Sequence, residues 1–567
     1  MSPRIESVSS LGFRPAGMPH PSPVDWRDHV MYFLLVDRFD NNAEGIPPFT
    51  PADAGTGRDP AAGGRFQGGN LKGVTRRLDY IRDLGCTALW LSPILRNRLR
   101  DDSYHGYGVQ DFLEVDPRFG TLEDLKTLTR EAHARGMYVI LDVVLNHAGD
   151  VFAYKGQVGC YTGQTYEFDH WNEDDPSPGL QATDGIWPRE LQRPEVFRRK
   201  GPICNWYNDE EAKNGDFLSL KELNTADPAV LDTLIKVYKY WIAEADLDGF
   251  RVDTVKHMEE SSTAIFCNAI REYAQRIGKH NFLLFGEIVA DDGTIQRYLG
   301  RNARLEWTDE RFPSLDAALD FPLYFSLEEV IKGFANPWVL RARYDSFHRN
   351  YADHGEAARH FVTFVDNHDQ MARPHRRFMH KNPYARQAVL AMGYLLTSQG
   401  VPCIYYGTEQ GFDGGGPDDR YVRECMFGGE WGAFDSTGHH FFNPDHPLYR
   451  AIAAIARVRA QQPALRYGRQ YFREISGNGV DFGHPIDGQC TLAYSRILDT
   501  EEVLVALNLD SRPRKDWVVV DKNLSAPAEI MRDLLDPTRR CTVHEFGGRA
   551  CVQVALDGHG MAILKVG

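Results

Sequence analysis

The sequence predicts an α/β fold: a (β/α)8 TIM barrel with an insertion after its third strand and a C-terminal antiparallel β-sandwich. Three observations predict this fold. From Val30 onward, short apolar runs of strand length alternate with segments of helical spacing, which is typical of parallel strands covered by helices. The alternation stops over residues 148–222. After Pro463, short strands with alternating apolar and polar residues replace it.

Eight short apolar segments are the predicted barrel strands, and each is bounded by polar residues. In chain order they are residues 30–36, 86–91, 137–144, 250–252, 282–285, 317–321, 361–365 and 401–406. The predicted helices around them include residues 71–84, 122–135, 232–245 and 448–460, the last of which closes the barrel. Thr121 is the expected N-cap of the helix over 122–135, with Asp124 in its first turn.

Residues 148–222 contain few apolar runs and many Gly, Pro, acidic and aromatic residues. A structureless loop of that length is uncommon in a compact domain, so we expect a small folded insertion. This divides the chain into a barrel formed by residues 1–147 and 223–463, the insertion over 148–222, and the sandwich over 464–567.

The composition, 42% hydrophobic and 25% charged over 567 residues, is that of a globular protein with several domains. The net charge is 64 − 79 = −15, and such an acidic chain is not expected to bind nucleic acid, because phosphate needs a basic surface. No apolar run is long enough to span a bilayer, so no membrane association is expected. The sequence does not indicate an oligomeric state.

The N-terminal segment is rich in Pro and Ser and has no apolar signal-peptide core, which predicts a cytoplasmic location. A mature chain whose signal peptide had been removed would look the same. The nine cysteines are scattered and contain no CxxC pair, so a zinc cluster or redox motif is not expected. Cys86 and Cys403 lie in predicted strands, where we expect reduced, buried thiols.

Four segments place acids, histidines or an arginine at or just beyond the end of a predicted strand. They are Asp142-Val-Val-Leu-Asn-His147, Gly249-Phe-Arg-Val-Asp-Thr-Val-Lys-His257, Phe285-Gly-Glu-Ile288 and Phe364-Val-Asp-Asn-His-Asp369. In a (β/α)8 barrel, the C-terminal ends of the strands form the face that carries the catalytic groups. The sequence therefore predicts that these four segments meet in one site.

The residue types in these segments suit acid–base and nucleophilic chemistry. Arg251 and Asp253 are two apart on a strand and point to the same face, so the guanidinium keeps the carboxylate ionised, as a nucleophile requires. Glu287 follows an apolar strand, where desolvation lets it hold a proton. Asp369 is a second acid that could stabilise positive charge. Each segment alone also has a structural interpretation: an ion pair for Arg251 and Asp253, a helix cap for Glu287 and a turn for Asp369.

In order, spacing and residue type, the four segments resemble glycoside hydrolase family 13, the α-amylase family. Segments 66–73 and 400–409 resemble family signatures as well. The resemblance covers residues 30–465, is thin in the insertion and is only architectural beyond it. It implies that the insertion is the domain B of that family. One motif departs from the family pattern: Leu220-Lys-Glu-Leu-Asn224 stands where Pro-Asp-Leu is usual.

The resemblance implies a role for each site residue. Asp253 matches the nucleophile, Glu287 the acid/base and Asp369 the transition-state stabiliser. The positions that match sugar-contacting residues around the cleaved bond are Tyr107, His147, Arg251 and His368. Lys256 and His257 match a pair that lines the leaving-group side in many α-1,4-acting members.

The resemblance also implies a structural Ca2+ between the barrel and the insertion, and no organic cofactor. The matching ligands are Asn146, Glu222 and the backbone oxygen of His257. Ca2+ takes 6–8 oxygen ligands, and the sequence does not identify the others. A polar loop without metal is the alternative.

The implied activity is that of a retaining enzyme that hydrolyses α-1,4 linkages in malto-oligosaccharides or starch-type glucans. A 4-α-glucanotransferase, a trehalose synthase or a sucrose-acting enzyme would use the same catalytic residues, so a transglycosylase or isomerase is the alternative. Non-catalytic relatives of the family have lost catalytic acids, whereas this chain keeps all three.

Overall fold

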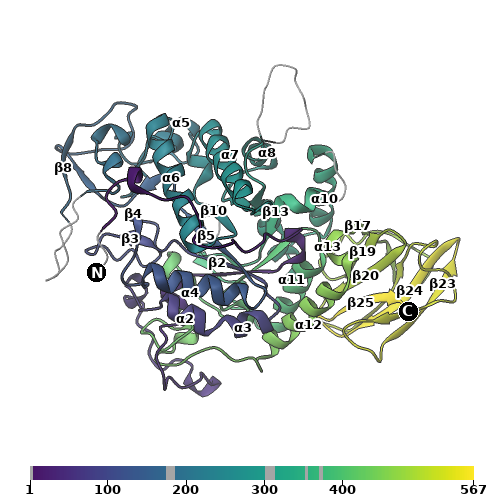
Figure 1. The fold of residues 1–567 in the computed structure, drawn as a ribbon. Helices are drawn as coiled ribbons and strands as arrows, with labels where there is room; N and C mark the ends of the chain where they lie inside the picture. The colour runs from purple at the N-terminus through teal and green to yellow at the C-terminus, as the bar shows by residue number, and fades with distance from the viewer. Residues whose placement is uncertain (1–3, 174–184, 301–312, 352–355, 370–374) are drawn as a thin grey trace, which may run out of the picture.

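The computed structural model describes residues 4–173, 185–300, 313–351, 356–369 and 375–567. Within these ranges, eight parallel strands close a barrel in the order β1-β15-β13-β12-β11-β10-β5-β2 (Figure 1). The strands are β1 Met31–Leu34, β2 Ala88–Leu91, β5 Tyr138–Val143, β10 Gly249–Val252, β11 Leu283–Gly286, β12 Ala317–Leu319, β13 Phe361–Thr363 and β15 Val401–Tyr405. Each overlaps its predicted segment, so the predicted barrel is confirmed.

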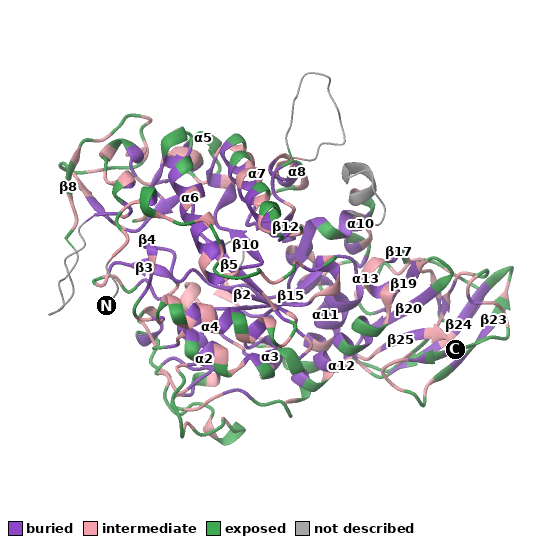
Figure 2. Ribbon diagram, viewed as in Figure 1, coloured by how far each residue is buried: buried purple, intermediate pink, exposed green. Residues whose placement is uncertain are grey.

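Helices pack around the outside of the barrel, with buried residues on the side that faces the strands (Figure 2). The longer ones are α4 Leu122–His133, α6 Pro228–Ala245, α7 Glu260–Arg276, α9 Phe321–Ile331, α10 Trp338–Tyr351, α11 Ala385–Thr397 and α12 Pro447–Gln461. At the start of α4, Thr121 and Asp124 form the predicted cap, since the Thr121 side chain accepts from the Asp124 N–H at 3.2 Å. All residues of β1, β2, β10 and β11 are buried, which holds the strand ends rigidly.

The predicted helix over residues 71–84 is wrong as a single element. The structure has two short helices, α2 Leu71–Arg76 and α3 Leu78–Asp83, which meet at Arg77. Arg77 leaves helical geometry, with φ −100° and ψ 7°, and its side chain forms an ion pair with the buried Asp40. A tertiary contact therefore outweighs the continuous helical spacing of the sequence.

The insertion is anchored to the barrel at both of its ends. Strand β6 His147–Ala148 pairs with β9 Lys221–Glu222, so the first and last residues of the insertion lie side by side. Between them, β7 Phe152–Tyr154 pairs with β8 Phe168–Trp171, and α5 spans Asp209–Asn214. Cys86 and Cys403 are buried free thiols, as predicted.

A disulfide that the sequence analysis did not predict crosses the insertion. Cys160 and Cys204 are joined with an S–S distance of 2.05 Å, across a sequence separation of 44 residues. Because the Cys spacing matches no motif, only the fold brings the two sulfur atoms together.

The C-terminal region follows a short helix. Helix α13 Pro463–Tyr467 comes after α12, and the first strand of the region is β17 Arg469–Phe472. In residues 469–566, all of which the structure describes, nine strands form an antiparallel sheet in the order β17-β19-β20-β25-β22-β23-β24-β21-β18. Side chains from distant strands, including Leu504, Val552 and Leu564, share one separate apolar core. The predicted β-sandwich is confirmed.

None of the helices in the described ranges combines the length and the hydropathy that crossing a bilayer requires.

Removing the Cys160–Cys204 disulfide should destabilise the insertion, because the crosslink restricts the unfolded chain. The chain-entropy model for a loop of this size gives roughly 3–4 kcal/mol. Hydrogen exchange of residues 148–222 with and without dithiothreitol measures the loss. A Cys160→Ser/Cys204→Ser variant is the control, since its exchange should not respond to the reductant. Equal protection of the wild-type insertion in both conditions would contradict the prediction.

Candidate active site

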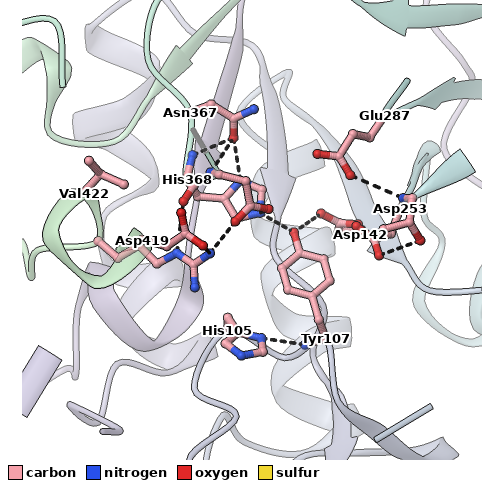
Figure 3. A network of polar contacts seen from close by, with 12 residues as sticks. His105, Tyr107, Asp142, Asp253, Glu287, Asn367, His368, Asp419 and Val422 are labelled. Carbon is pink, nitrogen blue, oxygen red and sulfur yellow. Dashed lines mark hydrogen bonds and ion pairs between the residues drawn. The ribbon is translucent and has the colours of Figure 1, made fainter. Parts of the chain in front are cut away.

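The four sequence segments meet at the C-terminal ends of the barrel strands. The register places Arg251 of β10 directly beside Asp142 of β5 and Phe285 of β11. Asp253 follows β10, and Glu287 follows β11. Figure 3 shows Asp142, Asp253 and Glu287 around one side of the site, with Tyr107 and His368 next to them.

Arg251 is fully buried and joins three carboxylates. Its Nη1 donates to Asp142 Oδ1 at 2.8 Å and to Asp253 Oδ1 at 2.6 Å, and its Nη2 lies 2.9 Å from Glu287 Oε2. Charge–charge interactions are strong in an interior that excludes water. One guanidinium therefore fixes the positions of Asp253 and Glu287 relative to each other.

Burial raises the pKa of Glu287 to about 7, against the opposing charge of Arg251. Its Oε2 also accepts a hydrogen bond from the Thr254 N–H at 3.3 Å. Burial raises the pKa of Asp253 too, but the Arg251 charge and a 3.1 Å hydrogen bond from Thr254 Oγ1 counteract the rise. Three acids share one cation, so a proton is retained at this cluster near neutral pH, and Glu287 is well suited to carry it.

Asp369 has the opposite electrostatic environment. Burial favours its neutral form, but the charges of His368 and Arg423 hold its pKa well below the ordinary value. His368 Nε2 lies 2.9 Å from Asp369 Oδ2, and Arg423 Nη2 contacts Oδ1. Asp369 is therefore an ionised acid, held by His368 and Arg423.

Arg423 is a site residue that the sequence analysis missed. Its Nε donates to the His368 carbonyl at 3.1 Å, and its Nη1 donates to the Tyr104 hydroxyl at 3.2 Å. It also forms an ion pair with Asp419 at 3.3 Å. Arg423 lies 54 residues from Asp369 in the sequence and does not stand at the end of a predicted strand. No sequence pattern therefore indicates that the two residues meet.

Asp142 was also missed, although it begins one of the four segments. Its Oδ2 accepts from the Tyr107 hydroxyl at 2.8 Å and from Trp90 Nε1 at 3.2 Å. Burial raises the pKa of Asp142, but the hydrogen bonds that it accepts from Arg251, Tyr107 and Trp90 favour its ionised form. The Tyr107 hydroxyl also lies 2.7 Å from His368 Nε2. Tyr107 therefore connects the Arg251 cluster to the Asp369 side of the site.

His147 lies next to Asp253. Its Nε2 is 3.9 Å from Asp253 Oδ2 and is a buried atom with no hydrogen-bond partner among the described residues. Burial lowers the pKa of His147 to about 3, so the ring is neutral. A neutral imidazole beside the candidate nucleophile is available to a sugar hydroxyl.

His257 faces the insertion rather than the acid cluster. His257 Nδ1 donates to the Ala212 carbonyl at 2.7 Å, and burial lowers the pKa of this histidine to about 4. Its ring packs against Phe217, with 5.2 Å between centroids. Lys256 is half-buried, and its carbonyl accepts from the Tyr298 hydroxyl at 3.3 Å.

The predicted calcium ligands Asn146 and Glu222 are in direct contact. Asn146 Nδ2 donates to Glu222 Oε2 at 2.7 Å, and the buried Asn146 Oδ1 has no hydrogen-bond partner among the described residues. Burial raises the pKa of Glu222 well above its ordinary value. A buried carboxylate and an unpartnered amide oxygen suit an oxygen-seeking cation. Among the described residues, no three His, Cys, Asp or Glu side chains cluster as metal ligands, so backbone oxygens and water would have to complete the shell.

Sequence comparison identifies relatives of this chain. Residues 33–428 match the family model "Alpha amylase, catalytic domain". An alpha-amylase from Streptomyces lividans is 32% identical, with 88% of this chain and 58% of the relative aligned. A beta/alpha-amylase from Paenibacillus polymyxa is 30% identical, with 86% of this chain and 35% of the relative aligned. This chain therefore spans only part of the length of both relatives.

Structural comparison agrees with the sequence match. The crystal structure of an alpha-amylase from Geobacillus thermoleovorans, complexed with acarbose, has a TM-score of 0.70 and 28% identity. It covers 96% of this chain, and this chain covers 99% of it. The acids at the strand ends, the closed barrel and the family model together lead to one conclusion: the chain belongs to the alpha-amylase family.

Proposed function

We propose that this protein is a retaining glycoside hydrolase that cleaves α-1,4 linkages in malto-oligosaccharides or starch-type glucans. The observation that carries the proposal is the Arg251 guanidinium, which holds Asp253 at 2.6 Å and Glu287 at 2.9 Å. Two carboxylates on one guanidinium favour the short separation, roughly 5–5.5 Å, of retaining enzymes. The relatives named alpha-amylase support the substrate class.

In the proposed mechanism, Asp253 attacks the anomeric carbon while Glu287 protonates the departing glycosidic oxygen. A covalent glycosyl-enzyme forms on Asp253. Water then attacks the anomeric carbon and breaks its bond to Asp253, while Glu287, now ionised, takes the proton of the water. Asp369, held ionised by Arg423, stabilises the positive charge that develops on the sugar ring.

Transglycosylation is the second candidate function. Relatives at 26% identity include a cyclomaltodextrin glucanotransferase from Klebsiella oxytoca and a cyclomaltodextrinase from a Bacillus species. In such a reaction, Glu287 would deprotonate a sugar hydroxyl in place of water, with no change in the acids. A non-catalytic, sugar-binding role would not require the raised pKa of Glu287 or the ionised Asp369.

A substrate panel with products resolved over time tests the proposal. Maltotriose and starch should be cleaved faster than isomaltose, sucrose or trehalose, and NMR should show the α-anomer of the product first. Early products longer than the substrate would identify transglycosylation. An initial β-anomer, or a clear preference for sucrose, isomaltose or trehalose, would contradict the proposed function.

The sequence predicts a cytoplasmic location. The Cys160–Cys204 disulfide instead favours an oxidising compartment, because disulfides persist mainly there.

We also propose that Asn146 and Glu222 bind a structural Ca2+, together with the backbone oxygen of His257. The support is the buried Glu222 carboxylate beside an amide oxygen that lacks a hydrogen bond. The ion would stabilise the junction at which β6 and β9 join the insertion to the barrel.

Glu287→Gln and Asp253→Asn should each remove most turnover and leave the fold intact. Loss of a general acid alone costs roughly 10²–10⁴-fold in rate. Initial rates on maltotriose measure the effect, and Glu123→Gln, on the exposed surface of α4, is the matched control. Near-normal rates in either folded active-site variant would disprove its role.

The rate should fall as the pH rises through about 7, because burial raises the pKa of Glu287 to about 7 and the acid must be protonated to act. The pH dependence of kcat/KM on maltotriose measures this decrease for the free enzyme. In Glu287→Gln the decrease at high pH should disappear. A wild-type profile that stays flat from pH 6 to 9 would contradict the assignment.

Chelation should lower the melting temperature if Glu222 binds Ca2+, since a ligand that binds only the folded state stabilises it. The wild type and Glu222→Gln are melted with and without EDTA, and only the wild type should respond. Unchanged wild-type melting, with no calcium in the purified protein, would exclude the site.

A further inference from the structure

One exposed disulfide ties two segments of the insertion together. Cys160 belongs to the loop over residues 155–167, which joins β7 to β8, and Cys204 precedes helix α5 (Figure 1). Both of these cysteines are exposed, whereas the other seven cysteines of the chain are buried free thiols. Buried thiols are inert toward reagents in solution. A reductant therefore acts on the Cys160–Cys204 disulfide.

The loop that carries Cys160 lies on the surface of the insertion. No residue of the loop over 155–167, all of which the structure describes, is buried. The backbone N–H groups of Lys155, Tyr161 and Tyr166 donate to other backbone carbonyls of the insertion, and the Tyr161 hydroxyl donates to Glu210 Oε1 at 3.1 Å. A segment with no buried side chain and with exposed hydrogen bonds opens at a low cost in free energy. The disulfide is therefore a main restraint on this loop.

The other end of the disulfide is joined to a group of packed rings. The Cys204 N–H donates to Glu211 Oε1 of α5 at 2.6 Å. Two residues further along the chain, the Trp206 ring packs edge-on against Phe217 and His257, with centroid distances of 5.0 and 5.9 Å. We call Trp206, Phe217 and His257 the aromatic wall.

The aromatic wall reaches the candidate nucleophile through one further ring. Phe217 stacks on His147 with 5.8 Å between centroids, and His147 Nε2 lies 3.9 Å from Asp253 Oδ2. The acids themselves are fixed separately, because Arg251 contacts both Asp253 and Glu287. A change at the disulfide can therefore loosen one wall of the site without displacing the two acids.

From these contacts, we infer that the Cys160–Cys204 disulfide is a redox switch for substrate affinity. In the oxidised protein, it keeps the loop over residues 155–167 on the segment that carries Trp206, and the aromatic wall is ordered. In the reduced protein, the loop separates and a smaller fraction of molecules has an ordered wall. When only the ordered form binds the sugar, the apparent affinity falls in proportion to that fraction. The inference rests on the proposed function, because it takes malto-oligosaccharides to be the substrates.

The reductant that operates the switch is a dithiol. One of its thiolates attacks a sulfur atom of the disulfide, the Cys160–Cys204 bond breaks, and a mixed disulfide forms. The second thiol of the reagent then displaces the protein sulfur. Two electrons and two protons pass to the protein, which gains two thiols, and the reagent becomes a cyclic disulfide. Oxidised glutathione reverses the change by the same exchange and leaves as two molecules of the thiol.

Steady-state kinetics on maltotriose test the inference. The wild type is measured before reduction with dithiothreitol, after reduction, and after reoxidation with oxidised glutathione. Reduction should raise KM by roughly tenfold, as expected when the ordered fraction falls to about one tenth, while kcat stays near its starting value. Reoxidation should restore KM, which it would not do after irreversible damage. Mass spectrometry of the alkylated cysteines measures the state of the disulfide in each sample.

Two variants serve as controls. Cys160→Ser/Cys204→Ser cannot form the crosslink, so it should have the raised KM in every condition and should not respond to dithiothreitol. Cys490→Ser removes a buried thiol of the C-terminal domain and should respond like the wild type. If the double variant does not fold, the reduced and reoxidised wild type still decide the question.

An unchanged KM in a wild type whose disulfide is reduced would overturn the inference and leave the proposed function standing. A disulfide that dithiothreitol does not reduce in the folded protein would also overturn it, because a switch must be accessible. If the oxidised wild type cleaves neither maltotriose nor starch, the proposed function fails. Hydrogen exchange at Trp206 and Phe217 then tests the switch by itself: faster exchange after reduction supports it, and equal exchange overturns it.

Discussion

The candidate active site depends on one cation buried in the barrel. The Arg251 guanidinium is fully buried, and Asp142, Asp253 and Glu287 all contact it. Removing a charge from water is costly unless opposite charges and hydrogen bonds compensate, so the arginine and its acids require one another. Three acids for one cation leave an excess of negative charge, which is why burial can keep a proton on the cluster near neutral pH.

The site places similar carboxylic acids in two different electrostatic environments. On one side, carboxylates outnumber the cation, and the pKa of Glu287 rises to about 7. On the other side, Arg423 and His368 both contact Asp369, and the pKa of this acid falls. Tyr107 spans the two sides through its hydroxyl group. Local charge balance, and not residue type, therefore separates an acid that can hold a proton near neutral pH from one that stays ionised.

The insertion is coupled to the site through packing. The Phe217 ring lies between His147 and His257, with centroid distances of 5.8 and 5.2 Å. The pairing of β6 with β9 holds the ends of the insertion at the strand that carries His147. The insertion thus forms one wall of the site, and a change in its packing would reach the residue beside Asp253.

The sequence by itself determined the eight strands, since their apolar runs and polar ends are local patterns. It also placed Arg251 beside Asp253, because side chains two apart on a strand share a face. Only the tertiary structure decided that Asp142 contacts Arg251, 109 residues away, and that Cys160 meets Cys204. Local spacing fixes the direction of a side chain within its own strand, whereas contacts between distant segments depend on how the closed barrel and its attached domains bring those segments together.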